Sequence, residues 1–106
     1  MKNNAFLYVD VDGTLLKWPG PTPGLRNDGT PEINKDLIKQ LRKWKERTNG
    51  YIIVWSGNGK THADWAVDFM GIEDLPDFVL GKPNIFIDDT YEWIDTRPKY
   101  NPDIRL

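Results

Sequence analysis

Residues 5–15, AFLYVDVDGTL, are the stretch of this sequence that decides its fold. The first five of them form a nearly continuous apolar run, which predicts a strand buried on both faces of a parallel sheet. Asp10 follows directly at the end of that strand, and Asp12 comes two residues later. Gly13 permits a sharp turn immediately after the two carboxylates. This segment therefore predicts a buried strand that delivers a pair of carboxylates to one edge of a sheet.

Further strands and helices are expected to alternate along the rest of the chain. Apolar residues at helical spacing predict two helices, one opening at Thr30 and Pro31 and ending at Asn49-Gly50, the other opening with a capping box at Thr61 and ending at Gly71. Residues 13–29 are rich in glycine and proline, which predicts a loop or an irregular hairpin. The remaining short apolar runs predict three strands, at residues 51–55, 78–80 and 85–87. In the tail from residue 90, only a helical turn at residues 91–94 is expected.

This alternation indicates an α/β fold. Strands joined by helices form a parallel sheet through right-handed crossovers. We expect a three-layer Rossmann-like domain with a small, mostly parallel sheet flanked by helices. The length of 106 residues favours one domain spanning residues 1–106.

Composition excludes several classes of function. The chain has no cysteine, which excludes disulfides, zinc sites built on thiolates and cysteine nucleophiles. A net charge of −2 gives no indication of nucleic-acid or membrane binding. No apolar stretch is long enough for a signal peptide or a spanning helix, so a cytoplasmic protein is expected.

Polar residues that follow the predicted strands indicate where a ligand would bind. In open parallel sheets, ligands bind beyond the carboxyl ends of the strands. Asp10, Ser56 and Asp88 each come directly after an apolar run, so we expect them at one edge of the sheet. Mg²⁺ prefers oxygen ligands and takes few of them from protein, so Asp10 and Asp12 predict a magnesium site that Asp88 and Asp89 complete.

The same residue types suit phosphoryl chemistry. A carboxylate can attack phosphorus and form an aspartyl-phosphate, while a second carboxylate protonates the leaving oxygen and then activates water. Ser56 and the backbone amides around Gly57 are candidates to hold phosphoryl oxygens. A lysine would stabilise the negative charge of the transition state.

At these residues the chain resembles the haloacid dehalogenase (HAD) superfamily. Residues 10–15, DVDGTL, resemble the family's first motif, and Ser56, Lys82 and the pair Asp88-Asp89 resemble the second, third and fourth in the correct order. The resemblance implies a Mg²⁺-dependent phosphomonoester hydrolase. In it, Asp10 is the nucleophile, Asp12 the general acid/base, and Thr14 supports the nucleophile loop. Ser56, Gly57 and Lys82 bind the phosphoryl group. The magnesium ligands are Asp10, the backbone carbonyl of Asp12, and Asp88, with Asp89 assisting.

Two departures from the family pattern bear on substrate and mechanism. The chain is too short between its motifs for a cap domain, which implies an open site suited to a bulky or macromolecular phosphate, or a site closed by a second subunit of a homo-oligomer. Only six residues separate Lys82 from Asp88, which is too short for a crossover between two parallel strands. Lys60 and Lys99 are therefore alternatives for the catalytic lysine.

Three other functions remain open at the level of sequence. A receiver-like domain that accepts a phosphoryl group also uses acidic residues and a lysine on a parallel sheet, although its acidic residues would be arranged differently. A non-catalytic module could retain the fold. A polynucleotide end phosphatase would suit the open site and the basic face of the first helix. Trp18 and Arg26 are candidates to contact the leaving group in any phosphatase.

Overall fold

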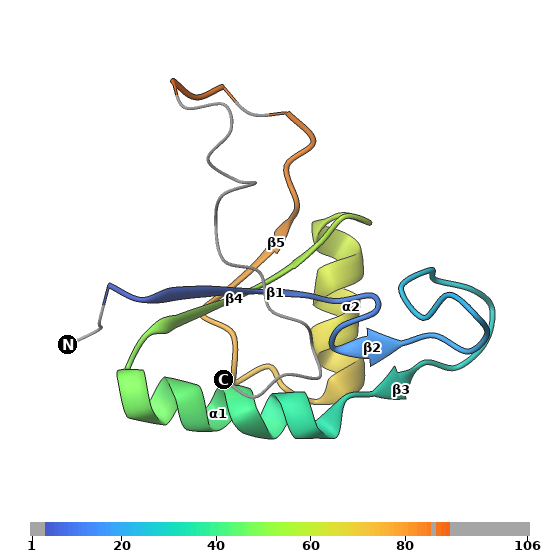
Figure 1. The fold of residues 1–106 in the computed structure, drawn as a ribbon, viewed down its shortest axis with the longest axis horizontal. Coiled ribbons are helices and arrows are strands. Elements are labelled where there is room, and N and C mark those ends of the chain that lie inside the picture. The colour runs from blue at the N-terminus through green and yellow to red at the C-terminus, as the bar shows by residue number, and fades with distance from the viewer. Residues whose placement is uncertain (1–3, 86, 90–106) are drawn as a thin grey trace.

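The computed structural model describes residues 4–85 and 87–89, and these contain a parallel three-stranded sheet (Figure 1). Its strands are β1 (Phe6–Asp10), β4 (Tyr51–Ser56) and β5 (Phe78–Gly81), in the order β1-β4-β5. Both neighbouring pairs are parallel. The strands expected at residues 5–9, 51–55 and 78–80 are therefore confirmed.

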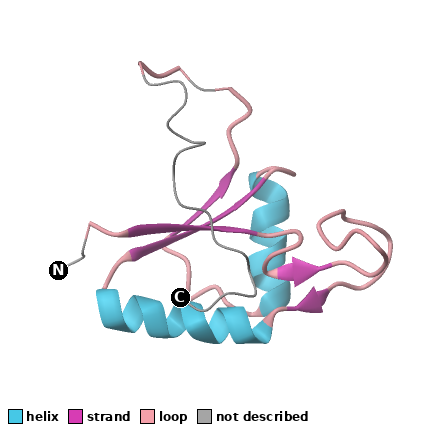
Figure 2. Cartoon of the chain, viewed as in Figure 1, coloured by secondary structure: helices cyan, strands magenta, loops and turns pink. Residues whose placement is uncertain are grey.

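Two helices connect these strands and pack into one hydrophobic core. Helix α1 (Lys35–Thr48) joins β1 to β4, and α2 (Lys60–Met70) joins β4 to β5 (Figure 2). Side chains from both helices and from one face of the sheet lie in the same buried cluster. They include Val9, Ile52, Val54, Leu37, Leu41, Ala63, Ala66 and Val67. The described chain is thus a small α/β domain, as the alternation of strands and helices predicts.

Helix α1 begins later than its sequence predicts. Its N-cap is Asn34, whose side-chain oxygen accepts a hydrogen bond from the Leu37 amide at 3.2 Å, so the expected start at Thr30 and Pro31 is wrong. The two residues before Asn34 instead form β3 (Glu32–Ile33), which pairs antiparallel with β2 (Leu16–Lys17). Of the two forms expected for residues 13–29, a loop or an irregular hairpin, this pairing confirms the hairpin. The helix ends at Asn49 in a left-handed conformation, as expected.

Helix α2 also differs at its start. Gly59 is its N-cap, and no side chain caps the first turn, so the predicted capping box at Thr61 and Asp64 is wrong. Asp64 pairs instead with Lys60 one turn earlier, at 2.7 Å. Because Lys60 is within reach at i, i+4, the carboxylate of Asp64 has an alternative to the helix amides. The expected end of the helix at Gly71 is confirmed.

The strand expected at residues 85–87 is wrong for the two of these residues that the structure describes. Ile85 and Ile87 lie outside any strand and are 83% and 101% exposed, while Phe86 falls outside the described residues. The chain leaves β5 at Gly81, and a parallel strand that follows another requires a crossover of roughly a dozen residues or more. The spacing therefore excludes a second parallel strand here. In Figure 1 this segment, drawn in orange, extends past the sheet and away from α1.

The two faces of the sheet differ in their covering. Val9, Ile52 and Val54 point toward the helices, whereas Phe6, Tyr8 and Phe78, on the other face, are between 50% and 56% exposed. Both described helices pack on the first face, so the third layer of the expected three-layer fold is not found among residues 4–85 and 87–89. The helical turn predicted at residues 91–94 lies outside them. Neither of the two described helices is long and apolar enough to cross a membrane.

Candidate functional site

Three predicted site residues meet at the carboxyl edge of the sheet. Asp10 is the last residue of β1, Ser56 the last of β4, and Lys82 follows β5 directly. The backbone amide of Lys82 donates to the carbonyl of Ser56 at 2.8 Å, which continues the pairing of β4 and β5 by one residue. The expectation that strand ends bring Asp10 and Ser56 to one edge is confirmed, and Lys82 joins them there.

The turn after β1 is held in place by its own backbone. The amide of Leu16 donates to the carbonyl of Val11 at 2.9 Å, and the amide of Gly13 donates to the carbonyl of Leu16 at 2.6 Å. Val11, Leu15 and Leu16 are fully buried and anchor the turn in the core. Gly13 has a φ of +87°, and a Cβ placed there would lie 2.8 Å from the Cα of Gly24. Only glycine fits this position, so both carboxylates start from a fixed turn.

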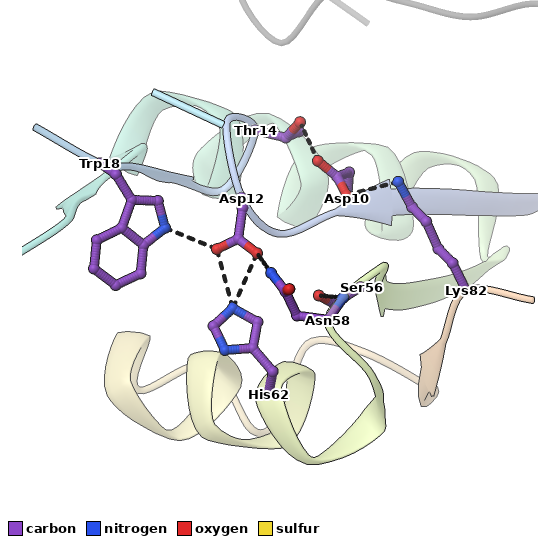
Figure 3. Close-up of polar contacts among 8 residues, drawn as sticks. All are labelled: Asp10, Asp12, Thr14, Trp18, Ser56, Asn58, His62 and Lys82. Carbon is purple, nitrogen blue, oxygen red and sulfur yellow. Dashed lines mark hydrogen bonds and ion pairs between the residues drawn. The ribbon is translucent and has the colours of Figure 1, made fainter. Parts of the chain in front are cut away.

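Asp10 lies between a lysine and a hydroxyl group. Lys82 Nζ is 2.8 Å from Asp10 Oδ1, and Thr14 Oγ1 donates to Asp10 Oδ2 at 3.1 Å (Figure 3). The ammonium group of Lys82 also lies 5.7 Å from the ring centroid of Trp55. The side chains of Asp10 and Lys82 remain 31% and 37% exposed. A carboxylate and a cation are thus held together where solvent, and hence a substrate, can reach them.

Asp12 is surrounded by three hydrogen-bond donors from three separate segments. Trp18 Nε1 donates to Oδ1 at 2.8 Å, Asn58 Nδ2 donates to Oδ2 at 2.8 Å, and His62 Nε2 lies 3.0 Å from both oxygens (Figure 3). A carboxylate only accepts hydrogen bonds, so His62 carries a proton on Nε2 in this arrangement. The side chains of Asp12 and His62 are only 7% and 5% exposed. Asp12 is therefore enclosed, in contrast to Asp10.

These donors set the acidity of Asp12. Burial by itself would raise the pKa of the carboxyl group, since it disfavours the charged form. Hydrogen bonds from Trp18, His62 and Asn58, together with attraction to the charge of His62, outweigh burial and hold the pKa of Asp12 below its ordinary value. Asp12 is consequently ionised at neutral pH in the free protein.

The loop after β4 provides a buried hydroxyl and an open backbone. Ser56 is only 1% exposed, and its Oγ accepts a hydrogen bond from the Asn58 amide at 3.0 Å. Gly57, next to it, faces open space, because a Cβ added there would meet no atom within 4 Å. Of the two phosphate-binding candidates on this loop, Gly57 is accessible to solvent. Ser56 is buried and stabilises the turn through its hydrogen bond with the Asn58 amide.

The structure distinguishes among the three candidate lysines. Lys82 contacts Asp10, whereas Lys60 directs its ammonium group to Asp64 at 2.7 Å. Lys99 lies outside the described residues. Among residues 4–85 and 87–89, Lys82 is thus the candidate that lies beside the predicted nucleophile.

The predicted magnesium ligands are not brought together in the described structure. Asp88 and Asp89 lie on the exposed segment beyond β5. Across residues 4–85 and 87–89, no group of three acidic or histidine side chains is placed to hold a metal ion. The two oxygens of Asp10 suit a hard cation, but no complete set of ligands forms around it among the described residues.

Sequence reasoning missed two of the three donors to Asp12. Asn58 and His62 are separated from Asp12 by 46 and 50 residues, and no local pattern links residues so far apart. Trp18 was predicted as a contact for the leaving group, but its indole N–H binds Asp12. Arg26, the other such candidate, is exposed. The one signal in the sequence for this role of His62 was its position, because the chain's single histidine lies in the first turn of a helix that starts beside the site.

Comparisons of the chain with protein-family models, with curated proteins and with solved structures found no match. The functional argument therefore depends on the site itself. It has two parts, which are the exposed pair of Asp10 and Lys82 and the enclosed carboxylate of Asp12.

Proposed function

We propose that this protein is a phosphomonoester hydrolase that acts through an aspartyl-phosphate on Asp10, as a small capless member of the HAD superfamily. One observation carries the proposal: Asp10 is held at the end of a parallel strand with its Oδ1 atom 2.8 Å from Lys82 Nζ, and both side chains are accessible. An exposed carboxylate beside a cation offers a nucleophile together with the charge that an anionic phosphoryl group requires.

In the first step, an oxygen of Asp10 attacks phosphorus. The bond between phosphorus and the leaving oxygen breaks, and the electron pair of that bond leaves with the oxygen. This oxygen takes up a proton from Asp12, whose protonated form is favoured by the adjacent anionic phosphoryl group. Lys82 lies where it can attract the phosphoryl oxygens as their charge rearranges. Thr14 donates to the other oxygen of Asp10 and so orients the carboxylate for attack.

In the second step, water attacks the phosphorus of the aspartyl-phosphate. The bond between phosphorus and the Asp10 oxygen breaks, which releases phosphate and regenerates the carboxylate. Asp12, which is ionised once it has given its proton to the leaving oxygen, is the candidate to accept the proton of the attacking water. The two carboxylates of one turn then have different tasks because their surroundings differ.

The start of α2 supports phosphoryl binding at the same edge. The N-cap of this helix is Gly59, which has no side chain to cap the first amide groups. The preceding loop is open at Gly57. Backbone amides at a helix N-terminus bind phosphate readily, and they would add to the positive charge of Lys82 in binding a phosphoryl group.

Magnesium is a separate part of the proposal and is supported by the sequence motifs rather than by assembled ligands. Bound at Asp10 and the Asp12 carbonyl, with Asp88 and Asp89, it would offset the repulsion between an anionic nucleophile and an anionic substrate. The finer fold, a three-layer Rossmann-like domain, is proposed on the same basis.

The open site suggests the class of substrate. Between β1 and α1 the chain forms only the β2–β3 hairpin and its loop, and residues 71–77 between α2 and β5 are few (Figure 1). Neither segment is long enough to form a cap domain over Asp10. We therefore propose a bulky or macromolecular phosphomonoester, or closure by a second copy of the chain.

The experiment is a turnover assay with Mg²⁺ on a panel of phosphomonoesters. The panel holds p-nitrophenyl phosphate, sugar phosphates, nucleotides and oligonucleotides phosphorylated at the 3′ or 5′ end. We expect release of many phosphates per protein molecule from at least one compound. Uptake of one phosphoryl group without turnover would identify a receiver-like domain instead, and neither uptake nor release would identify a non-catalytic module.

A further inference from the structure

Three N–H groups from separate segments donate to Asp12, and the proposed reaction steps do not by themselves require all three. Trp18 lies just after β2, Asn58 in the loop after β4, and His62 in the first turn of α2. Three segments separated in sequence thus direct one N–H group each at a single carboxylate. We refer to Trp18, Asn58 and His62 as the Asp12 clamp.

The clamp restricts the orientation of Asp12. The Asp12 side chain is only 7% exposed, so its hydrogen bonds come from protein groups rather than from solvent. Here each oxygen has a donor of its own at 2.8 Å, and His62 Nε2 lies 3.0 Å from both. Rotation of the carboxylate about its own axis, or of the side chain to another rotamer, would break at least two of these contacts.

A layer of aromatic rings supports two members of the clamp. The ring of Trp65 stacks on that of His62, with centroids 5.4 Å apart, and on that of Trp18, with centroids 6.3 Å apart. His62 and Trp18 are themselves buried, at 6% and 5% exposure. Rings packed in this way are held in one orientation, which is what a precisely placed functional group needs from its supporting residues.

We propose that Trp18, Asn58 and His62 are positioning residues that hold Asp12 at the geometry needed to give a proton to the leaving oxygen and to accept one from the attacking water. This inference rests on the proposed phosphatase function and deepens it. A general acid or base acts only within hydrogen-bond reach of the proton it transfers, so a looser clamp weakens proton transfer and leaves the attack by Asp10 unaffected. The hydrogen bonds of the clamp run to Asp12, whereas Asp10 is held by Thr14 and Lys82.

The test compares two substrates that differ in their need for a proton on the leaving group. Nitrophenolate departs without protonation, whereas phenolate from phenyl phosphate is a poorer leaving group. The variants His62→Phe and Trp18→Phe each remove one donor and keep an aromatic ring against Trp65. We expect each variant to lower kcat/KM for phenyl phosphate by about tenfold or more, and for p-nitrophenyl phosphate by less than about threefold.

Two further variants keep the result interpretable if stability falls. His62→Gln retains an N–H donor, so it should recover part of the loss on phenyl phosphate. Lys45→Met removes an ion pair with Asp77, 3.2 Å long, near the opposite end of β4. It provides a destabilised control, and it should leave the ratio of the two kcat/KM values unchanged.

The outcomes separate the clamp from the proposed function. An equal loss on both substrates in the donor variants, or no loss on either, would overturn the positioning role while the phosphatase function stands. A selective loss that His62→Gln fails to reduce would also count against a hydrogen-bonding role of His62. If the wild-type protein turns over neither substrate nor any member of the panel, the proposed function fails and the positioning role fails with it.

Discussion

Asp10 and Asp12 leave the same turn, but their carboxylates have different neighbours. Asp10 meets one lysine and one hydroxyl and stays accessible, while Asp12 accepts three hydrogen bonds in a nearly closed space. Two carboxylates whose surroundings differ in this way can take separate parts in one reaction. The division of labour therefore follows from the side chains that surround each residue rather than from the motif alone.

The role of Lys82 can be tested at the level of one residue. We expect Lys82→Met to lower kcat/KM by about 10²–10³, because the variant loses the positive charge that faces the phosphoryl oxygens. The fold should persist, since the side chain is 37% exposed. Lys43→Met is the matched control, because Lys43 is an exposed lysine on α1. Retention of activity in Lys82→Met would exclude this lysine and direct attention to Lys60 and Lys99.

The lowered pKa of Asp12 predicts how stability depends on pH. The folded protein binds this proton less tightly than the unfolded chain does, whose carboxyl group titrates near 3.8. The ionised carboxylate therefore contributes stability above that pH, and the contribution disappears as the pH falls through the folded-state pKa. Compared with Asp12→Asn, the wild type should be more stable by about 2 kcal/mol at neutral pH.

Urea unfolding of both proteins between about pH 7 and about pH 2.5 measures this difference. The gap in the free energy of unfolding should shrink as the pH drops below the ordinary value of an aspartate. A difference in the free energy of unfolding that stays constant over this range would show that the charge of Asp12 does not contribute to stability. Any loss of stability in Asp12→Asn would then come from the changed shape of the side chain alone.

At the residue scale, the sequence predicted what lies at strand ends and missed what lies across the fold. Asp10 and Ser56 each follow an apolar run, and parallel strands place such residues at one edge. Their meeting could therefore be predicted. The contact of Asp12 with Asn58 and His62 could not, because it depends on how α2 lies against the turn after β1.

At the scale of elements, strands and helix ends were easier to predict than helix starts. The apolar runs of β1, β4 and β5 are short, and turn residues follow them, which favours strands over helices. Helix starts depend on competing local contacts. Glu32 and Ile33 pair with β2 rather than continue α1, and Asp64 pairs with Lys60 rather than cap α2. The sequence allows both contacts in each case, but it does not indicate which of the two is more stable.

The turn after β1 offers a test at this scale. In Gly13→Ala the added Cβ would lie 2.8 Å from the Cα of Gly24, and the φ of +87° disfavours any side chain. Because the clashing atom belongs to the backbone, it cannot rotate away, and we expect a loss of roughly 1–3 kcal/mol in the free energy of unfolding. Gly57→Ala, in open space, should change it by less than about 1 kcal/mol. Denaturant unfolding of the two variants makes the comparison, and equal effects would contradict the close approach of the two loops.

At the scale of the whole molecule, the described chain shows an α/β domain covered by helices on one face of its sheet. Phe6, Tyr8 and Phe78 remain exposed on the other face. The sequence predicted a parallel sheet correctly, but it placed one strand too many after β5. Apolar character alone suggested that strand, and the length of the connection excludes it.

Dependence on magnesium is also a property of the whole site. We expect dialysis against EDTA to abolish phosphatase activity and added Mg²⁺ to restore it. Ca²⁺ should restore little, because it prefers more ligands and longer distances. Circular dichroism should show the fold unchanged by EDTA. Full activity after complete removal of divalent ions would contradict the magnesium part of the proposal and leave the roles of Asp10 and Lys82 intact.

The central claim is that Asp10 carries the phosphoryl group during turnover. Acid quenching during hydrolysis of p-nitrophenyl phosphate, followed by tryptic digestion and mass spectrometry, tests it directly on the peptide of residues 3–17. We expect a phosphorylated form of this peptide in the wild type, with fragment ions that place the group on Asp10. Asp10→Asn should show neither the modification nor turnover while its circular dichroism spectrum stays unchanged. Turnover by Asp10→Asn, or a phosphoryl group found only on another residue, would contradict the account.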